Sequence, residues 1–247
     1  MNMREVIKKE DGTLEFRYGS PMRKSIVDWC RDNSHYNITA NRMDRLFQDG
    51  LVLPESDEDV VRFLSDSGTP GYPDTLALLG NVYKDGVGTN TNFVTAAEYF
   101  AKGADEGCGD ACGALSEMYY VGQGVPKDKE KSDDLVDMAE EIFEREGNNG
   151  DMWAVKALAD SYYSRHGLFC VTYWEESAKA NMIAAEGGIG GAAYSLGWQY
   201  EHEQGVPENL DMALRYYSLA DELGYPIAKE CVERLSKKLG KTGGSSE

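Results

Sequence analysis

The feature that most constrains the fold of this chain is a short apolar pattern that recurs along most of its length. In its clear copies an alanine, a leucine and a tyrosine follow one another at intervals of four residues, as in Ala111, Leu115 and Tyr119. Steps of 36, 43 and 38 residues separate the anchoring tyrosines Tyr83, Tyr119, Tyr162 and Tyr200. Residues four apart share one face of an α-helix, and repeats of roughly 20 to 50 residues are typical of solenoids. The pattern therefore predicts a stack of helix–turn–helix units.

A glycine-rich turn and a second apolar helix complete each unit. Residues 122–126 read Gly-Gln-Gly-Val-Pro, in which the glycines allow positive φ and the proline can open the next helix. Paired alanines such as Ala184 and Ala185 let the second helix pack back on the first. The glycine after the leucine, at Gly80 and Gly197, removes a side chain where another helix must approach closely. Because one unit cannot bury its apolar face alone, stability is expected to come from stacking neighbours.

The spacing defines the repeat region as residues 39–227, with five repeats. The first repeat is degenerate, and Phe47 stands at the tyrosine position. The 43-residue step between two of the tyrosines predicts an insertion around residues 140–149, made of an extended helix and a loop.

The two ends of the chain lack the repeat pattern and are expected to cap the array. Residues 1–38 are predicted to form an N-terminal cap made of a short hairpin and a helix from Ser20 to about Cys30. The apolar residues of that helix, Ile26, Val27 and Trp29, would cover the exposed face of the first repeat. Residues 228–247 are predicted to be a C-terminal capping helix followed by a tail.

The repeated motif resembles that of the Sel1-like repeat family, whose members are short relatives of the tetratricopeptide repeat. The matching pattern is Ala-x-x-x-Leu-Gly-x-x-Tyr, then Gly-x-Gly-Val-x-x-Asp, an aromatic pair and Ala-Ala-x-x-Gly. The repeat that contains Tyr162 departs from it, because residues 164–170 replace the glycine-rich turn. The resemblance implies an all-α fold, a right-handed α/α solenoid with a small N-terminal cap. It also implies that the first helices line a concave surface, where tetratricopeptide-type proteins usually bind peptides.

The charge of the chain argues against one class of partner and leaves two explanations open. The formal net charge is −18, from 25 basic and 43 acidic residues. Nucleic-acid binding rewards clustered lysine and arginine, so we expect no nucleic-acid partner. Residues 1–70 hold 13 acidic and 10 basic residues, so most of the excess lies in the repeats. This acidity either attracts a basic partner or keeps a long solenoid in solution.

Other features of the sequence give expectations about location and chemistry. No apolar run is long enough to span a membrane, and the start has no signal-peptide stretch, so we expect a cytoplasmic protein without a membrane partner. The five cysteines are irregularly spaced, and His35, His166 and His202 share no metal-ligand spacing. No motif pairs a nucleophile with a base. We therefore expect no catalytic residue, no metal and no cofactor.

The repeat register identifies positions on the first helices that face inward instead of into the core. Many of them are aromatic or acidic, as a groove for a basic and apolar segment would require. An alternative stays open, because some of these aromatic rings could cover the neighbouring repeat, and Trp153 could pack on the insertion. The predicted partner-binding residues are Glu117, Tyr120, Trp153, Asp160, Tyr163, Tyr194, Trp198 and Glu201.

The preferred hypothesis is a protein–protein interaction scaffold or adaptor, not an enzyme, that binds a partner protein or peptide on the concave face of the later repeats. A specific version is an acidic inhibitor of a basic partner, such as an immunity protein or antitoxin. The resemblance brings an alternative, because some bacterial proteins with these repeats bind or hydrolyse β-lactams. Those relatives have regularly spaced cysteine pairs, which this chain lacks. A third possibility is a structural subunit that uses its convex side.

Overall fold

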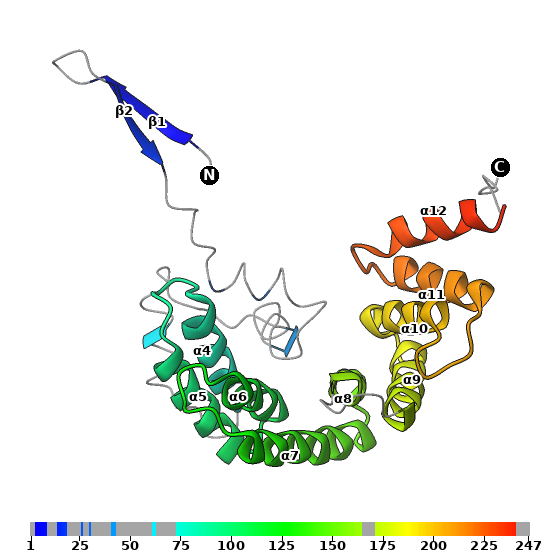
Figure 1. Ribbon diagram of the computed structural model, residues 1–247, viewed down its shortest axis with the longest axis horizontal. Helices are drawn as coiled ribbons and strands as arrows, with labels where there is room; N and C mark the ends of the chain where they lie inside the picture. The colour runs from blue at the N-terminus through cyan, green and yellow to red at the C-terminus, as the bar shows by residue number, and fades with distance from the viewer. Residues whose placement is uncertain are drawn as a thin grey trace.

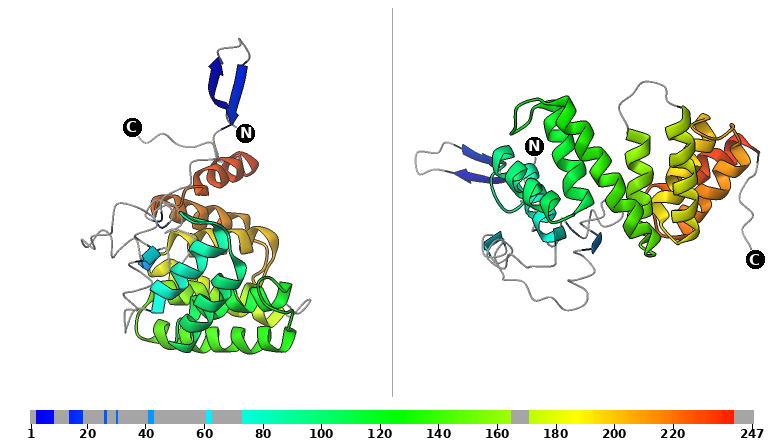
Figure 2. Two further views of the ribbon diagram at one scale, coloured as in Figure 1. Left: turned by 90° about the vertical axis from the view of Figure 1, so that its left-hand side faces the viewer. Right: turned by 90° about the horizontal axis from the view of Figure 1, so that it is seen from below.

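The computed structural model describes residues 3–8, 14–18, 26, 30, 41–42, 61–62, 73–164 and 171–240. Within these residues two strands precede nine helices (Figure 1). Strands β1 (Met3–Lys8) and β2 (Leu14–Tyr18) pair antiparallel, with Lys8 opposite Leu14, and the hairpin projects from the helices (Figure 2). The helices are α4 (Pro73–Asp85), α5 (Phe93–Asp105), α6 (Gly109–Val121), α7 (Lys129–Asn148), α8 (Met152–Ser164), α9 (Val171–Glu186), α10 (Gly190–His202), α11 (Leu210–Glu222) and α12 (Ala228–Lys238).

The helices pack in consecutive pairs that follow the repeats of the sequence. Helix α4 packs on α5, α6 on α7, α8 on α9 and α10 on α11, and α12 covers α11 at the C-terminal end. The pairs stack into an arc, with α7 running between the earlier and the later repeats (Figure 1). The predicted all-α repeat array is confirmed in these residues.

The recurring tyrosine closes the turn between two paired helices. In three repeats its carbonyl oxygen accepts the backbone N–H of the residue that caps the second helix. The N–O distances are 2.8 Å for Asn92 to Tyr83, 2.9 Å for Asp128 to Tyr119 and 2.9 Å for Asn209 to Tyr200. The side chain of each capping residue accepts a further backbone N–H from the first turn of its helix. The repeated tyrosine and the Asn or Asp nine residues later therefore act together to set the hairpin of helices.

The ring of the same tyrosine joins the two helices of a pair. Tyr83 stacks on Tyr99 with ring centroids 5.6 Å apart, and Tyr200 stacks on Tyr216 at 5.7 Å. Both contacts link a first helix to its second helix, which explains the aromatic pairs on α5 and α11.

The glycine after the leucine allows a close approach between paired helices. A Cβ atom placed on Gly80 in the middle of α4 would lie 2.4 Å from Cε1 of Phe100, whose side chain is fully buried. The same position on α10 is Gly197, where a Cβ atom would lie 2.9 Å from the ring of Tyr217. In both pairs a large aromatic ring of the second helix fills the space that the glycine leaves open.

Helix α7 differs from the other helices in length, and this difference shapes the inner face. It has 20 residues, whereas α4, α5 and α6 have 13 each. The seven additional residues fall within the insertion predicted at 140–149 and lengthen α7 by about 10 Å. Ile142 and Phe143 near this end form a buried cluster with Ala154 of α8. Helix α8 therefore packs on the extended part of α7 and is displaced along it relative to α6.

Part of the chain before the repeats packs on α4. Ile26 and Cys30 are fully buried in a cluster with Leu78, Leu79 and Val82. Several predictions lie outside the described residues: most of the helix from Ser20 to Cys30 with Val27 and Trp29, the degenerate first repeat apart from residues 61–62, the departure at 165–170 and the tail at 241–247.

The close approach at Gly80 predicts opposite effects for two alanine substitutions. Gly80→Ala is expected to lower the free energy of unfolding by about 1 to 3 kcal/mol, because the new methyl group overlaps the buried ring of Phe100. Gly113→Ala, also inside a 13-residue helix, is the matched control, because a Cβ atom there meets nothing within 4 Å. We expect Gly113→Ala to raise the free energy of unfolding by up to about 1 kcal/mol, through helix propensity alone. Urea unfolding followed by circular dichroism measures both, and equal effects would contradict the packing at Gly80.

Candidate functional site

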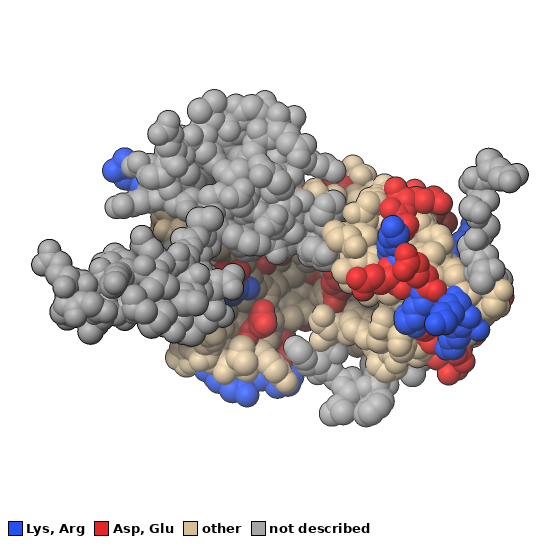
Figure 3. Space-filling model, turned by 90° about the horizontal axis from the view of Figure 1, so that it is seen from above, with Lys and Arg blue, Asp and Glu red and all other residues tan. Residues whose placement is uncertain are grey.

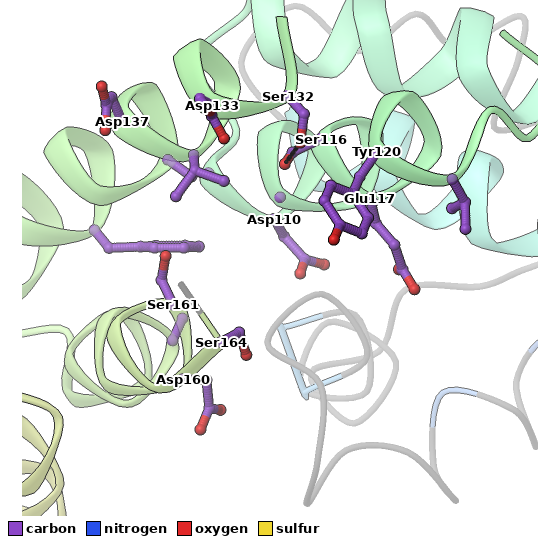
Figure 4. A pocket seen from close by; sticks show the side chains of 18 of the residues that line it. Asp110, Ser116, Glu117, Tyr120, Ser132, Asp133, Asp137, Asp160, Ser161 and Ser164 are labelled. Atoms are coloured by element: carbon purple, nitrogen blue, oxygen red, sulfur yellow. Dashed lines mark hydrogen bonds between the residues drawn. The ribbon is translucent and has the colours of Figure 1, made fainter. Parts of the chain in front are cut away.

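A pocket of about 980 Å³ lies on the inner face of the array, between α6, α7 and α8 (Figure 4). Its position follows from the displacement of α8 along α7, which separates α8 from α6. Residues of α4 and α9 complete the lining at its edges, among them Asn81, Lys84 and Tyr173. Pockets of several hundred Å³ are the usual size of ligand sites, so this one can hold a few side chains of a partner.

The apolar part of the pocket comes from side chains that also belong to the core. Ala139 and Phe143 of α7 are buried, and Trp153 and Ala157 of α8 pack against the same cluster. Trp153 thus packs on the extended end of α7, as the alternative interpretation of this residue proposed, and lines the pocket as well. The aromatic surface in the pocket is held in place by the contact between α7 and α8.

Carboxylates outnumber lysines in the lining. The acidic residues are Asp110, Glu117, Asp133, Asp137 and Asp160, and the basic residues are Lys84, Lys129 and Lys156. Two of the lysines form ion pairs within the pocket, Lys129 with Asp133 at 2.6 Å and Lys156 with Asp160. The pocket therefore has an excess of negative charge that a cationic side chain would complement.

Buried hydrogen bonds fix the helices around the pocket. The hydroxyl groups of Ser116 and Ser132 lie 3.0 Å apart and join α6 to α7. The hydroxyl of Ser161 on α8 donates to Oε1 of Glu140 on α7 at 2.9 Å. These serines line the pocket (Figure 4), but their bonds to neighbouring helices show a positioning role.

Tyr162, the residue after Ser161 on α8, makes a second link to α7. The hydroxyl of Tyr162 donates to Oε1 of Glu144 at 3.0 Å, and burial together with this carboxylate raises the pKa of Tyr162 to about 12. The phenol therefore stays protonated as a donor at neutral pH, and the link between the two helices is kept.

Four of the predicted partner-binding residues line this one pocket, and they come from two helices. Glu117 and Tyr120 project from α6, and Trp153 and Asp160 from α8 (Figure 4 labels all but Trp153). Glu117 and Asp160 are both exposed, on opposite sides of the pocket. The structure thus brings together these four predicted residues of α6 and α8.

Two other predicted residues form a separate aromatic contact between α8 and α10. Tyr163 meets the ring of Trp198 edge-on with centroids 6.0 Å apart, and Trp198 stacks on His202 at 4.2 Å. Tyr163 is 42% exposed, so this cluster presents aromatic surface outside the pocket. Nδ1 of His202 lies 2.9 Å from the carbonyl oxygen of Trp198.

The last two predicted residues contact the C-terminal helices. The ring of Tyr194 packs against Tyr217 and Tyr225, with centroids 5.3 Å and 4.9 Å away. The Glu201 carboxylate, 7% exposed, receives two hydrogen bonds from Arg234 at 2.5 Å and 2.7 Å, and one from the hydroxyl of Tyr217 at 3.0 Å. For these two positions the structure shows the alternative arrangement, in which inward-facing residues are covered by a neighbouring unit.

The register did not identify the contribution of α7 to the pocket. Asp133 and Asp137 are acidic residues four apart on one face of this helix, a signal that was present in the sequence. They were missed because only first helices were expected to line the inner face. The long α7 is a second helix, yet it faces the pocket where α8 is displaced.

Three further features bear on other chemistry in the described part of the chain. No group of His, Cys, Asp and Glu side chains there has a metal-binding arrangement, and His35 and His166 lie outside it. No helix in the described ranges has the length and apolar character of a membrane span. Cys30, Cys108, Cys112 and Cys231 are free thiols, and burial raises the pKa of Cys112 to about 11. Such a thiol is a poor nucleophile at neutral pH.

Comparison with known proteins is consistent with the repeat architecture. The family model described as Sel1 repeat matches residues 73–108, 109–132 and 191–225. A Sel1 repeat protein from Oxalobacter formigenes has a similar fold, with a TM-score of 0.57 and 22% identity over 87% of this chain and 82% of that one. A protective antigen of uropathogenic Escherichia coli with the same repeat fold gives a TM-score of 0.51 and 22% identity, over 89% of this chain and 45% of that one.

A sequence relative is much longer than this chain. It is an Arabidopsis thaliana protein named ERAD-associated E3 ubiquitin-protein ligase component HRD3B, 31% identical over 97 residues. The match covers 39% of this chain and 15% of the plant protein, so the chain spans a small part of that relative.

The contacts of Glu201 predict a pH-dependent contribution to stability. Its hydrogen bonds from Arg234 lower the pKa of the Glu201 carboxyl. The Glu201 carboxylate therefore adds to the free energy of unfolding above its unfolded-state pKa of about 4.3. This addition is lost as the pH falls through the lower pKa of the folded state. We expect Glu201→Gln to lower the free energy of unfolding by about 1 kcal/mol at pH 7 and by less near pH 3.

Urea unfolding at the two pH values measures this difference. Glu222→Gln, an exposed position on α11, is the matched control and should change stability at neither pH. An effect of Glu201→Gln that is the same at both pH values would show that the ion pair with Arg234 does not stabilise the C-terminal helices.

Proposed function

We propose that this chain is a binding scaffold for a basic segment of a protein partner. The premise is that it carries Sel1 repeats at residues 73–108, 109–132 and 191–225 and shares the fold of a Sel1 repeat protein. Such repeats usually mediate protein binding. The proposed site is the pocket between α6, α7 and α8. The observation that carries the proposal is the excess of carboxylates around a fixed aromatic surface in that pocket.

The two kinds of surface in the pocket suit different parts of a basic segment. The ring of Trp153 offers an apolar contact for the methylene groups of lysine or arginine, and aromatic rings also attract cations. Glu117 and Asp160 stand on opposite sides of the opening and can receive the charged ends. A segment with basic residues separated by an apolar residue would satisfy both.

The charge of the whole molecule supports the same kind of partner. A net charge of −18 favours the approach of a basic protein at long range. On the face seen from above, acidic side chains border the hollow between the earlier and later repeats, and a basic patch lies over the later repeats (Figure 3). An acidic inhibitor of a basic protein is one form that this scaffold can take, and a cytoplasmic location remains our prediction for it.

The chemistry of the pocket favours binding over catalysis. Sel1-like repeat proteins are generally non-catalytic scaffolds, although some are β-lactamases. Ser116 and Ser132 are hydrogen-bonded to each other, and Ser161 donates to Glu140. Among the described residues, no histidine lines the pocket. We therefore propose no catalytic role for these residues.

A pair of matched peptides tests the proposed site. One fluorescein-labelled peptide of eight residues alternates arginine and leucine, and its twin carries citrulline, which is uncharged, in place of arginine. We expect the arginine peptide to bind and the Glu117→Gln/Asp160→Asn variant to weaken binding about tenfold, equivalent to about 1.4 kcal/mol. The loss of Asp160 also leaves Lys156 without its ion-pair partner, which adds repulsion in the pocket.

The control variant for this experiment is Glu98→Gln/Asp105→Asn. It removes the same two charges from exposed positions on α5, a second helix that does not line the pocket. Fluorescence anisotropy at 150 mM salt should give the control variant nearly the affinity of the wild type. Equal weakening by both variants, or equal binding of the citrulline peptide, would exclude the pocket as the specific site.

A further inference from the structure

An arginine from the part of the chain that precedes α4 lies between three carboxylates on the inner side of the array. Nη1 of Arg42 is 3.0 Å from Oδ1 of Asp74, and its Nη2 is 2.7 Å from Oε2 of Glu146 and 2.9 Å from Oδ2 of Asp151. The Arg42 side chain is 22% exposed. The three carboxylates raise the pKa of Arg42 in spite of its partial burial, so the guanidinium is held as a cation.

The three carboxylates come from two parts of the fold, the start of α4 and the turn between α7 and α8. Asp74 is in the first turn of α4, Glu146 in the last turn of α7, and Asp151 directly precedes α8. Asp151 uses its other oxygen, Oδ1, to accept the backbone N–H groups of Trp153 and Ala154. Its side chain is therefore fixed at the start of α8, and the carboxylate trio of Asp74, Glu146 and Asp151 is a formed feature of the helices.

The carboxylate trio borders the proposed binding pocket. Trp153, whose N–H bonds to Asp151, contributes its ring to the pocket lining. The thiol of Cys108 donates to Asp74 at 3.8 Å, and the next two residues, Gly109 and Asp110, line the pocket. The trio thus lies at the end of the pocket where α6 and α8 begin.

The region before the repeats has a second, apolar attachment nearby. Ile26 and Cys30 are buried against Leu78 and Val82 of α4, the helix that also supplies Asp74. The described residues before α4 therefore contact this helix in two ways, through the apolar side chains of Ile26 and Cys30 and through the ion pair of Arg42 with Asp74. One arginine among three carboxylates leaves an excess of negative charge, which favours the approach of another cation.

We propose that Arg42 is an internal ligand that occupies the carboxylate trio beside the pocket until an arginine of the partner replaces it. The inference rests on the proposed function, because it assigns the regulation of the same site. Exchange of one guanidinium for another re-forms the same hydrogen bonds, so the exchange itself costs little. The internal ligand is present at a high effective concentration. The apparent affinity for the partner is therefore the intrinsic affinity multiplied by the fraction of molecules in which Arg42 has left the carboxylate trio.

Removal of the internal ligand should strengthen binding of the arginine peptide described above. We expect Arg42→Ala to raise its affinity about tenfold while binding of the citrulline twin stays weak. Arg215→Ala removes one positive charge from an exposed position on α11 and serves as the control, with a change of less than about twofold. Arg42→Lys keeps the cation but loses the two-pronged geometry, so its affinity should lie between those of the wild type and Arg42→Ala.

A second readout follows the release of the region before the repeats. Cys30 is fully buried in the unliganded protein, and Cys112, buried between the repeats, is an internal reference. We expect the arginine peptide to increase the rate at which N-ethylmaleimide labels Cys30, but not Cys112, as measured by peptide mass spectrometry. Arg42→Ala should increase labelling of Cys30 without any peptide.

The outcomes separate the two proposals. Peptide binding to the wild type with no gain in Arg42→Ala and Arg42→Lys would overturn the internal ligand and leave the binding pocket intact. Binding to neither the wild type nor Arg42→Ala would overturn both. If Arg42→Ala does not fold, the Arg42→Lys affinity and the effect of the peptide on Cys30 labelling in the wild type decide the question, and no change in either overturns the internal ligand.

Discussion

The inner face of this molecule depends on the contact between the long end of α7 and the start of α8. If α7 had the 13 residues of its neighbours, α8 would follow α6 as closely as α6 follows α4. Instead, Ile142 and Phe143 near the end of α7 bury Ala154 of α8, and α6 and α8 are separated. The pocket between them is a consequence of this displacement. A small change in one helix length therefore converts a uniform stack into an array with a pocket.

Charge has two uses on this inner face. At the C-terminal end Glu201 is held by Arg234 and Tyr217, so its charge stabilises the packing of the last helices. In the pocket, by contrast, Glu117 and Asp160 are exposed. The carboxylate trio around Arg42 combines both properties, because it links three helices and also holds a basic group at the border of the pocket. The same acidic composition can thus stabilise the fold and receive a basic partner.

The repeat itself was accessible from the sequence because its determinants are local. The tyrosine spacing, the turn glycines and the glycine after the leucine act within one helix pair, and the contact of Gly80 with Phe100 follows from that register. The extension of α7 was also visible as the long step between two tyrosines. The displacement of α8 that results from this extension was not visible in the sequence, because it depends on which surface of the extended α7 packs against α8.

The candidate site was only partly predictable for the same reason. Inward-facing positions follow from the register, but the register does not say which of them a neighbouring helix covers. Tyr194 and Glu201 meet α11, α12 and the residues between them, whereas Glu117 and Asp160 line the pocket between α6, α7 and α8. The contact of Arg42 with Glu146 and Asp151 joins residues more than 100 positions apart and left no pattern in the sequence.

The tryptophan indoles offer the most direct test of where a basic segment binds. Trp153 lines the pocket, Trp174 lies on α9, and Trp198 belongs to the separate aromatic cluster with Tyr163. Their N–H signals can be resolved in a nitrogen-15 NMR spectrum and assigned by single substitutions. During titration with the arginine peptide we expect the Trp153 signal to shift in proportion to occupancy while those of Trp174 and Trp198 stay in place. A shift confined to Trp198, or no shift of any of the three, would contradict binding in the pocket between α6, α7 and α8.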